Sequence, residues 1–361
     1  MRLTKNDELS MKINSGYLYA IFSAVLFGAS TPAAKYFLKE IHPILLAGLF
    51  YSGAGIGIFI ILLGRKLFLH GGSDTKLHLR DFKWLLIATL CGGIAAPVLL
   101  MVSLAKMSAS TVALLLNLET VFTALTAWFL FKEHTSRNIV IGLILIVVGG
   151  FILAWPQHFS FNVLSGVIFI TLACFLWAID NNVTRNISNV DPLIIVAIKS
   201  LVSGATNTTL AFILGIEFFH RAMLFGLSAT VGFFSYGLSL VCFVLALRYI
   251  GTGRTSACFS LAPFIGASFA VIFLNDPLTI QLILAGSLMG LGTWLHLTEH
   301  HEHEHFHDRM IHEHRHIHDD HHQHNHHPDD PVGEPHSHAH EHEPLKHSHQ
   351  HFPDIHHRHK H

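Results

Sequence analysis

Glu119 is the carboxylate with the strongest claim to chemistry, because it lies near the middle of the apolar run 109–131. An acid kept away from water can exchange a proton near neutral pH or bind a cationic group. Asn117 is close in sequence, although residues two apart do not share a face of a helix. We therefore expect Glu119, with Asn117 as a weaker candidate, to bind a proton or a cation. A purely structural hydrogen bond to a neighbouring helix is the alternative.

A second polar group ends the apolar run 163–183 and consists of Asp180, Asn181 and Asn182. One helix cannot turn three adjacent polar side chains away from lipid, so these residues are expected to line a cavity. If the helix is short, they lie at the membrane surface instead. Asp180 and Thr184 are four residues apart and share a face of the helix.

Two lysines also lie within apolar runs. Either Lys199 or Lys35 can extend along its stem toward the membrane surface. Otherwise Lys199 needs an acidic partner, for which Asp180 and Glu119 are the candidates. Pro32 could break the helix that carries Lys35 and expose backbone groups that bind a solute.

Helices that cross a membrane must position these residues. A hydrocarbon core of about 30 Å needs about 20 apolar residues per helix, and this chain is 51% hydrophobic and only 13% charged. Runs of that length recur ten times, joined by short turns. They lie at 16–38, 43–64, 83–104, 109–131, 137–155, 163–183, 192–214, 222–247, 252–274 and 279–298. The pattern predicts an all-α membrane protein with ten transmembrane helices.

Charge asymmetry predicts how the helices are oriented. With the N-terminus in the cytoplasm, thirteen Lys and Arg residues fall on the inner side of the membrane and three on the outer side. Basic residues are concentrated in cytoplasmic loops. We therefore expect a multi-pass protein of the cytoplasmic (inner) cell membrane with both termini in the cytoplasm.

The two halves of the chain are related. Leu118–Ala124 matches Leu261–Ala267 at an offset of 143 residues, and Glu133 then falls on Asp276. Five spans per half is an odd number, so the two copies cross the membrane in opposite directions. The sequence predicts two inverted five-helix repeats, an architecture in which solute sites lie near the midplane between the halves.

These features resemble the EamA-type drug/metabolite transporters over most of residues 16–298. The resemblance rests on residues 26–32, 116–119 leading to 131–133, 177–178, and 261–263 leading to 275–277. It implies ten helices in two inverted halves and the export or exchange of a small metabolite. The tail, with His-x-His repeats after residues 295–299, looks like that of a His-tailed subgroup.

The C-terminal tail has a different character from the body. Residues 300–361 contain 25 histidines and 12 acidic residues, with few apolar side chains, so we expect the tail to be disordered. His-x-His spacing places imidazoles on one side of an extended chain, which suits Zn, Ni or Co. A solvated tail without metal and a pH sensor are alternatives. The candidate ligands are His301, His303, His305, His307, His312, His314, His316, His318, His336, His338 and His340.

Other chemistry finds no support in the sequence. Gly251-x-Gly253 lacks a phosphate-loop pattern, the four cysteines form no CxxC pair, and no catalytic Ser/His/Asp arrangement is present. We expect no enzyme, no required cofactor and no nucleic-acid partner. The expected partners are the lipid bilayer, a small solute and divalent metal ions on the tail, and a homodimer is left open.

The sequence therefore predicts a cytoplasmic N-terminus (1–15), two repeats (16–155 and 163–298) and a tail (299–361). The first interpretation is a secondary transporter of a small metabolite, with Glu119, Asn117, Asp180, Asn181, Asn182 and Lys199 at its solute or coupling site. Two alternatives are a divalent-metal (Ni/Co/Zn) exporter and a membrane-anchored metal buffer or sensor.

Overall fold

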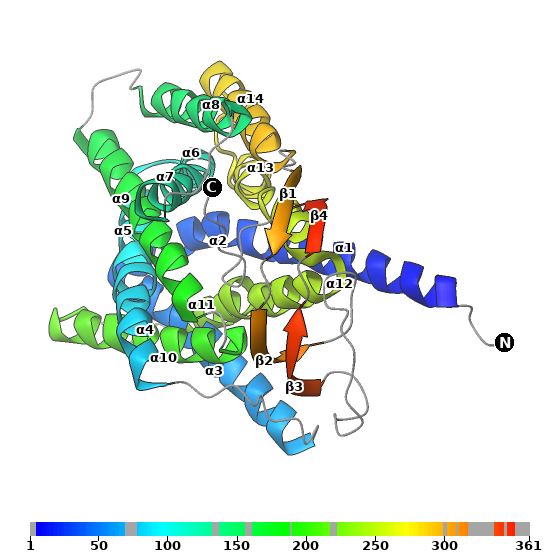
Figure 1. Ribbon diagram of the computed structural model, residues 1–361. Coiled ribbons are helices and arrows are strands. Elements are labelled where there is room, and N and C mark those ends of the chain that lie inside the picture. Colours follow the sequence, from blue (N-terminus) through cyan, green and yellow to red (C-terminus); the bar gives the residue numbers. More distant parts are fainter. Residues whose placement is uncertain are drawn as a thin grey trace. The chain divides into compact units, whose positions relative to one another are not determined.

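The computed structural model describes residues 5–68, 78–131, 137–155, 161–187, 190–216 and 222–298, and four strands in the tail. The chain divides into two units, Met1–Glu299 and His300–His361. Among the described residues, the first unit contains helices and the second contains strands (Figure 1).

The first repeat comprises segments 1 to 5. Segment 1 combines α1 (Lys5–Gly28) and α2 (Ser30–Phe37), and segment 2 is α3 (Pro43–Phe68). Segment 3 follows the short turn η1 (Leu79–Asp81) and joins α4 (Phe82–Ala88), the π-helix η2 (Thr89–Ala95) and α5 (Ala96–Lys106). Segment 4 consists of α6 (Ala109–Leu115) and α7 (Leu118–Phe131), and segment 5 is α8 (Arg137–Ala154).

The second repeat comprises segments 6 to 10. Segment 6 is α9 (Phe161–Thr184), which ends in the 3₁₀ turn η3 (Arg185–Ile187), and segment 7 is α10 (Pro192–Ile213). Segment 8 joins α11 (Ala222–Gly232), the π-helix η4 (Phe233–Leu238) and the start of α12 (Ser239–Phe259). Segment 9 contains the end of α12 and α13 (Ala262–Leu274), and segment 10 is α14 (Ile280–Leu297).

These segments agree with the ten predicted spans. Among the described residues, nine helical stretches are long and apolar enough to cross a membrane, and Ile280–Leu295 is a shorter apolar tenth. The all-α membrane fold expected from the sequence is confirmed. The helix ends carry ordinary caps: the Ser108 side chain accepts from Thr111 N at the start of α6, and Asn275 ends α13 with φ +56°.

Prolines account for two breaks within segments. Pro32 has no N–H to donate to the carbonyl four residues earlier, and the chain breaks at Ala29 between α1 and α2. Pro263 likewise follows the break at Ser260–Leu261 in segment 9. The break predicted at Pro32 is therefore present.

The 143-residue offset between the halves is visible in the helices themselves. Adding it to the bounds of α8 gives the bounds of α14. It also brings the π-helix η2 of segment 3 onto the π-helix η4 of segment 8 to within one residue. Each half therefore contains the same unusual widened turn at the same place.

Segments 5 and 10 pack against each other as inverted copies (Figure 1). A Cβ atom on Gly149 would meet Ala285 and Met289, whereas one on Gly292 would meet Gly142 and Ile146. The offset relates each set of neighbours to the other. Residue numbers rise along one helix as they fall along its partner, so the two helices run antiparallel, as inverted repeats require.

Glycines allow segment 2 to approach the second repeat closely. A Cβ atom on Gly53 would meet the backbone of Ala229, and one on Gly55 would meet Leu201. Small residues serve this purpose widely in membrane bundles.

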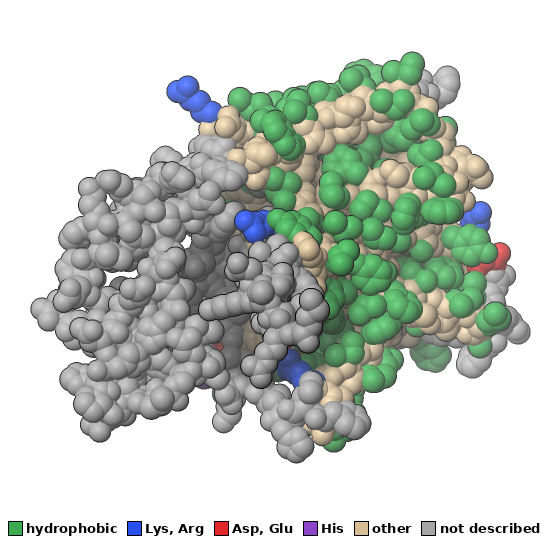
Figure 2. All heavy atoms as spheres, turned by 90° about the vertical axis from the view of Figure 1, so that its right-hand side faces the viewer, with side chains coloured by type: hydrophobic (Ala, Val, Ile, Leu, Met, Phe, Trp, Pro, Cys, Tyr) green, Lys and Arg blue, Asp and Glu red, His purple; other side chains and the backbone are tan. Residues whose placement is uncertain are grey.

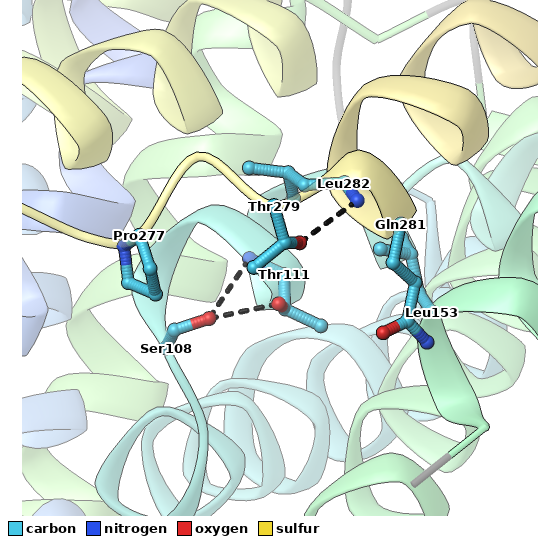
Figure 3. A pocket seen from close by; sticks show the side chains of 7 residues that line it. All are labelled: Ser108, Thr111, Leu153, Pro277, Thr279, Gln281 and Leu282. Carbon is cyan, nitrogen blue, oxygen red and sulfur yellow. Dashed lines mark hydrogen bonds between the residues drawn. The ribbon is translucent and has the colours of Figure 1, made fainter. Parts of the chain in front are cut away.

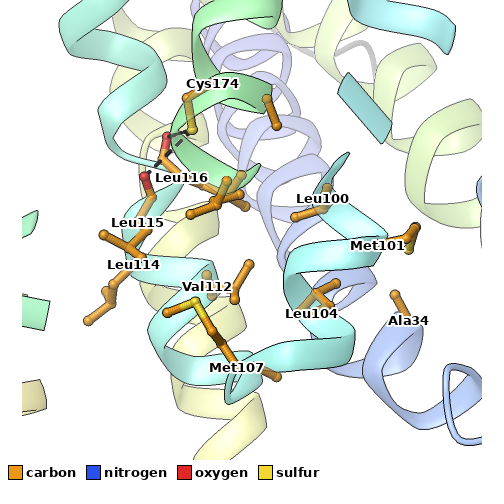
Figure 4. Close-up of a cluster of buried hydrophobic side chains, with 14 of the residues drawn as sticks. Ala34, Leu100, Met101, Leu104, Met107, Val112, Leu114, Leu115, Leu116 and Cys174 are labelled. Atoms are coloured by element: carbon orange, nitrogen blue, oxygen red, sulfur yellow. Dashed lines mark hydrogen bonds between the residues drawn. The ribbon is translucent and has the colours of Figure 1, made fainter. Parts of the chain in front are cut away.

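The main apolar cluster joins segments of both halves. Met101, Leu104, Val112 and Leu115 are buried in it. Figure 4 shows these side chains on the neighbouring helices α5 and α6. The Cys174 thiol of α9 lies 3.6 Å from the Leu115 carbonyl oxygen and 3.9 Å from that of Leu116, where segment 4 is broken. Packing here stabilises the break that precedes α7.

Apolar side chains also cover the outside of the helical unit. Phe129, Phe151, Phe161 and Ile280 are all strongly exposed. Figure 2 shows hydrophobic side chains spread over the described part of one face. A soluble protein rarely exposes so much contiguous apolar surface, and a lipid bilayer provides the environment that accommodates it.

The tail contains strands where the sequence led us to expect a disordered segment. β1 (Glu302–His307) pairs antiparallel with β4 (Leu345–Gln350), and β2 (Met310–His316) pairs antiparallel with β3 (His336–His342). Alternation of histidine with other residues fits the period of a strand, and the ladder bonds join backbone groups, so a large apolar core is not required. His301 and His318 lie outside the described residues.

Candidate functional site

Glu119 lies in the first turn of α7, directly after the break in segment 4. The break is held locally, because Asn117 Nδ2 donates to the Leu114 carbonyl oxygen at 2.8 Å. A carboxylate at this end of a helix interacts favourably with the helix dipole, worth about 0.3–1 kcal/mol. The break therefore provides a helix N-terminus, with Glu119 beside it, inside the membrane segment.

Asn181 is the hydrogen-bond partner of Glu119. Its Nδ2 donates to Glu119 Oε1 at 2.8 Å, which joins segments 6 and 4. Glu119 is half-buried and Asn181 is exposed, so the pair remains reachable from outside the packed core. No salt bridge joins Glu119 to any Lys, Arg or His side chain that the structure describes.

Asp180 and Lys199 form an ion pair between segments 6 and 7. The Asp180 side chain is 5% exposed and that of Lys199 is 16% exposed. Thr184 Oγ1 donates to the other carboxylate oxygen of Asp180 at 3.1 Å. Both charges also lie within electrostatic reach of Glu119, so one site holds two carboxylates and one ammonium group.

Gly92 brings the π-helix η2 against this ion pair. A Cβ atom at Gly92 would collide with the Asp180 carboxylate, so only glycine leaves room for the pair. The Gly92 carbonyl oxygen accepts hydrogen bonds from Tyr51 Oη and Trp177 Nε1, each at 3.0 Å. Three segments therefore meet at one carbonyl group next to the charges.

Two pairs of aromatic rings involve residues next to the charged group. Tyr51 stacks on Tyr236 of the π-helix η4, with ring centroids 5.4 Å apart. Phe122, one turn beyond Glu119, packs edge-on against Phe175 with centroids 5.6 Å apart. Aromatic faces attract cations as well as apolar groups. The two π-helices, related by the repeat, thus each contribute a residue to the site.

Of the six body residues predicted for the site, four meet in it: Glu119, Asn181, Asp180 and Lys199. The other two bind backbone groups instead. Asn117 caps its own helix. Asn182 Nδ2 donates to the carbonyl oxygens of Ala178 and Thr123, at 2.9 and 3.3 Å.

Lys35 is also used structurally. Its Nζ donates to the carbonyl oxygens of Leu104 and Met107, at 2.6 and 2.8 Å, and thereby caps the end of α5. A cation is favourable there because the carbonyl groups at the end of a helix carry partial negative charge.

Tyr51, Gly92 and Tyr236 were missed by the sequence analysis. The signal for Tyr51 was weak, a lone tyrosine in an apolar run, although a buried tyrosine hydroxyl usually finds a hydrogen-bond partner. The role of Gly92 depends on contact with segment 6, which the sequence of segment 3 does not reveal.

A separate small pocket lies where segments 4, 5 and 10 meet. Its lining residues are Ser108, Thr111, Leu153, Pro277, Thr279, Gln281 and Leu282 (Figure 3). Their polar groups serve as caps: Thr279 Oγ1 accepts from Leu282 N at 3.1 Å, and Gln281 Nε2 donates to the carbonyl oxygen of Trp155 at 2.9 Å. This pocket holds no ionisable side chain and is a weaker candidate than the Glu119 site.

Comparisons with known proteins agree with this architecture. The model of the EamA-like transporter family matches residues 14–155 and 164–298, which are the two repeats. An uncharacterized transporter of Methanothermobacter thermautotrophicus is 29% identical over 296 residues, which cover 78% of this chain and 85% of that protein. A solved crystal structure aligns with a TM-score of 0.59 at 18% identity, covering 79% of this chain and 98% of that one. At that identity the likeness shows the fold alone.

Proposed function

Since the chain belongs to the EamA-like transporter family, and is therefore a multi-pass membrane transporter of a small solute, we propose that it is a secondary transporter working by alternating access between its two repeats. Glu119 is the residue that binds the coupling proton or the cationic group of the solute. The observation that carries this proposal is the membrane position of Glu119 with an amide, Asn181, as its hydrogen-bond partner.

The charges of the site support a cationic ligand. Lys199 neutralises Asp180, so the pair contributes little net charge. Among the side chains that the structure describes, no cation is paired with Glu119, which leaves one negative charge in a low-dielectric region, where such a charge is costly. A proton, or an ammonium group on the solute, removes that cost. Competition between the two for one carboxylate couples solute movement to proton movement in the opposite direction.

Each neighbouring group has a distinct role in this proposal. Asn181 orients the carboxylate through its amide N–H. The aromatic faces of Tyr51 and Trp177 accommodate the apolar body of the solute and attract its charge. The Asp180–Lys199 pair joins segments 6 and 7 and keeps the lysine from neutralising Glu119.

A proteoliposome assay tests the role of Glu119. The vesicles contain a pH-sensitive dye and receive a panel of amines, amino acids and organic acids. We expect at least one cationic or zwitterionic compound to drive proton movement with the wild-type protein. Glu119→Gln is expected to lower this signal at least about 100-fold, because the amide cannot exchange a proton.

Two control variants accompany this measurement. Glu119→Asp keeps a carboxylate and is expected to retain part of the activity. Glu40→Gln removes a carboxylate at an exposed position after segment 1 and is expected to behave as the wild type. Full proton-coupled transport by Glu119→Gln would show that Glu119 has no part in coupling.

The location proposed for the protein is the inner cell membrane, with both termini and the tail in the cytoplasm. The thirteen basic residues on one side against three on the other support this orientation. The tail binds divalent metal ions through its histidines, and its 25 imidazoles favour Zn, Ni or Co.

Export of such a metal is the second candidate function, favoured by the tail. The helical unit does not support metal export. Among the residues whose side chains the structure describes, no group of three or more His, Cys, Asp or Glu is placed to hold a metal ion. An anchored metal buffer is the third candidate, and it gives no reason for ten membrane segments.

A further inference from the structure

The histidines of the tail lie directly opposite one another across its strands. In the β1–β4 ladder, His303 pairs with His349 and His305 with His347. The β2–β3 ladder has three such pairs: His312 with His340, His314 with His338 and His316 with His336. Five histidine pairs therefore join two parts of the chain that are far apart in sequence.

Both ladders follow a single register. In each, a residue pairs with the residue that is equally far from position 326 on the other side. The sequence extends this mirror arrangement by one step, since His301 and His351 are also equidistant from 326. These two residues lie outside the described residues.

A change of phase in the histidine pattern supports the same register independently. In the first arm of the tail, residues 301–318, histidines occupy odd positions up to His307 and even positions from His312. In the second arm, residues 336–351, they occupy even positions up to His342 and odd positions from His347. The two changes lie opposite each other in the register. Odd-numbered histidines therefore face odd-numbered ones in the β1–β4 pair, and even-numbered histidines face even-numbered ones in the β2–β3 pair.

Opposed histidines also share a face of their sheet. Residues two apart in a strand lie on the same face, and directly opposed residues share a face as well. His303, His305, His347 and His349 are therefore all on one face of the β1–β4 pair. Glu302, Glu304 and Ser348 belong to the other face.

This spacing suits a metal ion with nitrogen ligands. Directly opposed residues have Cβ atoms about 4.5–5.5 Å apart, and the next pair on the same face is about 7 Å further along. Four histidine residues at these register positions match the number of ligands that zinc takes in structural sites. Nickel, cobalt and copper(II) also accept imidazole, whereas calcium and magnesium prefer oxygen ligands.

We propose that divalent transition-metal ions bind across the paired arms of the tail. One ion binds at His303, His305, His347 and His349, and at least one more binds across β2 and β3. Ligands from both arms hold each ion, so metal binding joins the start of the tail to its end. This inference rests on the proposed metal binding by the tail and specifies which histidines act together.

Nickel binding to the untagged full-length protein in detergent tests the arrangement. Equilibrium dialysis followed by elemental analysis gives the number of Ni²⁺ ions per chain. The first-arm variant is His303→Gln with His305→Gln, the second-arm variant is His347→Gln with His349→Gln, and a fourth protein carries all four changes. The matched control is His357→Gln with His359→Gln, which has the same His-x-His spacing but no histidine at the mirrored positions 295 and 293.

We expect each two-residue variant to lose one bound Ni²⁺ ion and the four-residue variant to lose the same single ion. The control is expected to lose none. If the four-residue variant loses two Ni²⁺ ions, each arm binds its own ion. That result would overturn this inference but not the proposed metal binding by the tail. A control that loses as much as the arm variants would also overturn it. If the wild-type protein binds no more Ni²⁺ than a protein ending at Thr298, the proposed metal function of the tail fails as well.

Discussion

At the residue scale, the Asp180–Lys199 pair determines how the site is charged. The lysine lies on segment 7 and neutralises a carboxylate of segment 6, so no cationic side chain that the structure describes is paired with Glu119 on segment 4. A buried pair of this kind contributes little net stability, but losing one member leaves an uncompensated charge. The effect of a substitution therefore depends on whether the partner charge is also removed.

A double-mutant cycle measures this dependence. We expect Lys199→Gln alone and Asp180→Asn alone each to reduce stability, by up to about 3–5 kcal/mol, because each leaves its partner charge unpaired. The variant with both changes should recover at least about 1 kcal/mol of the sum of the two losses. Thermal unfolding in detergent provides the measurement. Strictly additive losses would show that the pair makes no direct interaction.

The sequence predicted which residues belong to the site better than it predicted their contacts. The sequence identified Glu119, Asp180, Asn181 and Lys199, because polar side chains in apolar runs are conspicuous. It left the partner of Lys199 open between Asp180 and Glu119, since the answer depends on how segments 4, 6 and 7 pack. Gly92 was not predicted for the same reason, because its role depends on contact with Asp180 of another segment.

At the element scale, the described helices are broken in segments 1, 4 and 9, and each half contains a π-helix, whereas the sequence predicted only the break in segment 1. Length and composition were sufficient to predict where all ten segments lie. Proline predicted the break in segment 1. Segment 4 breaks without a proline, at Leu116–Asn117, where an asparagine side chain bonds the backbone. A break of that kind depends on local hydrogen bonds that sequence periodicity does not reveal.

Substitutions in segments 5 and 10 test the inverted pairing. Gly149→Leu and Gly292→Leu are expected to reduce stability by similar amounts, about 1–3 kcal/mol each, because both insert a side chain into equivalent close contacts. Gly64→Leu is the matched control, since nothing lies within 4 Å of a Cβ atom there. Thermal unfolding of the three variants gives the comparison. If either Gly149→Leu or Gly292→Leu behaved like the control, the repeat contact would be wrong.

At the scale of the whole molecule, the chain combines two units with different physical character. The charge distribution anticipated this division: the first 299 residues have a net charge of about +6, and the tail has about −7 with neutral histidine. The strands of the tail were not predicted from its composition. Their pairing depends on the order of the residues, since each residue pairs with the one equally far from position 326 on the other side.

Deletion of the tail separates the roles of the two units. A protein that ends at Thr298 retains both matched family regions. We expect it to transport solute in proteoliposomes within about twofold of the full chain and to lose its bound Ni²⁺. The twofold allowance reflects the small free-energy change, about 0.4 kcal/mol, to which that rate ratio corresponds. Complete loss of transport would favour a function carried by the tail.

The antiparallel contact between segments 5 and 10 has a consequence for the direction of transport. A scaffold whose halves are inverted copies presents similar backbone surfaces to the two sides of the membrane, so we expect its inward-facing and outward-facing conformations to be close in free energy. The site is not duplicated in the same way: the position that matches Glu119 in the second half is Ala262. In the proposed mechanism, the net flux therefore follows the gradients of the solute and of the proton that competes with it for Glu119.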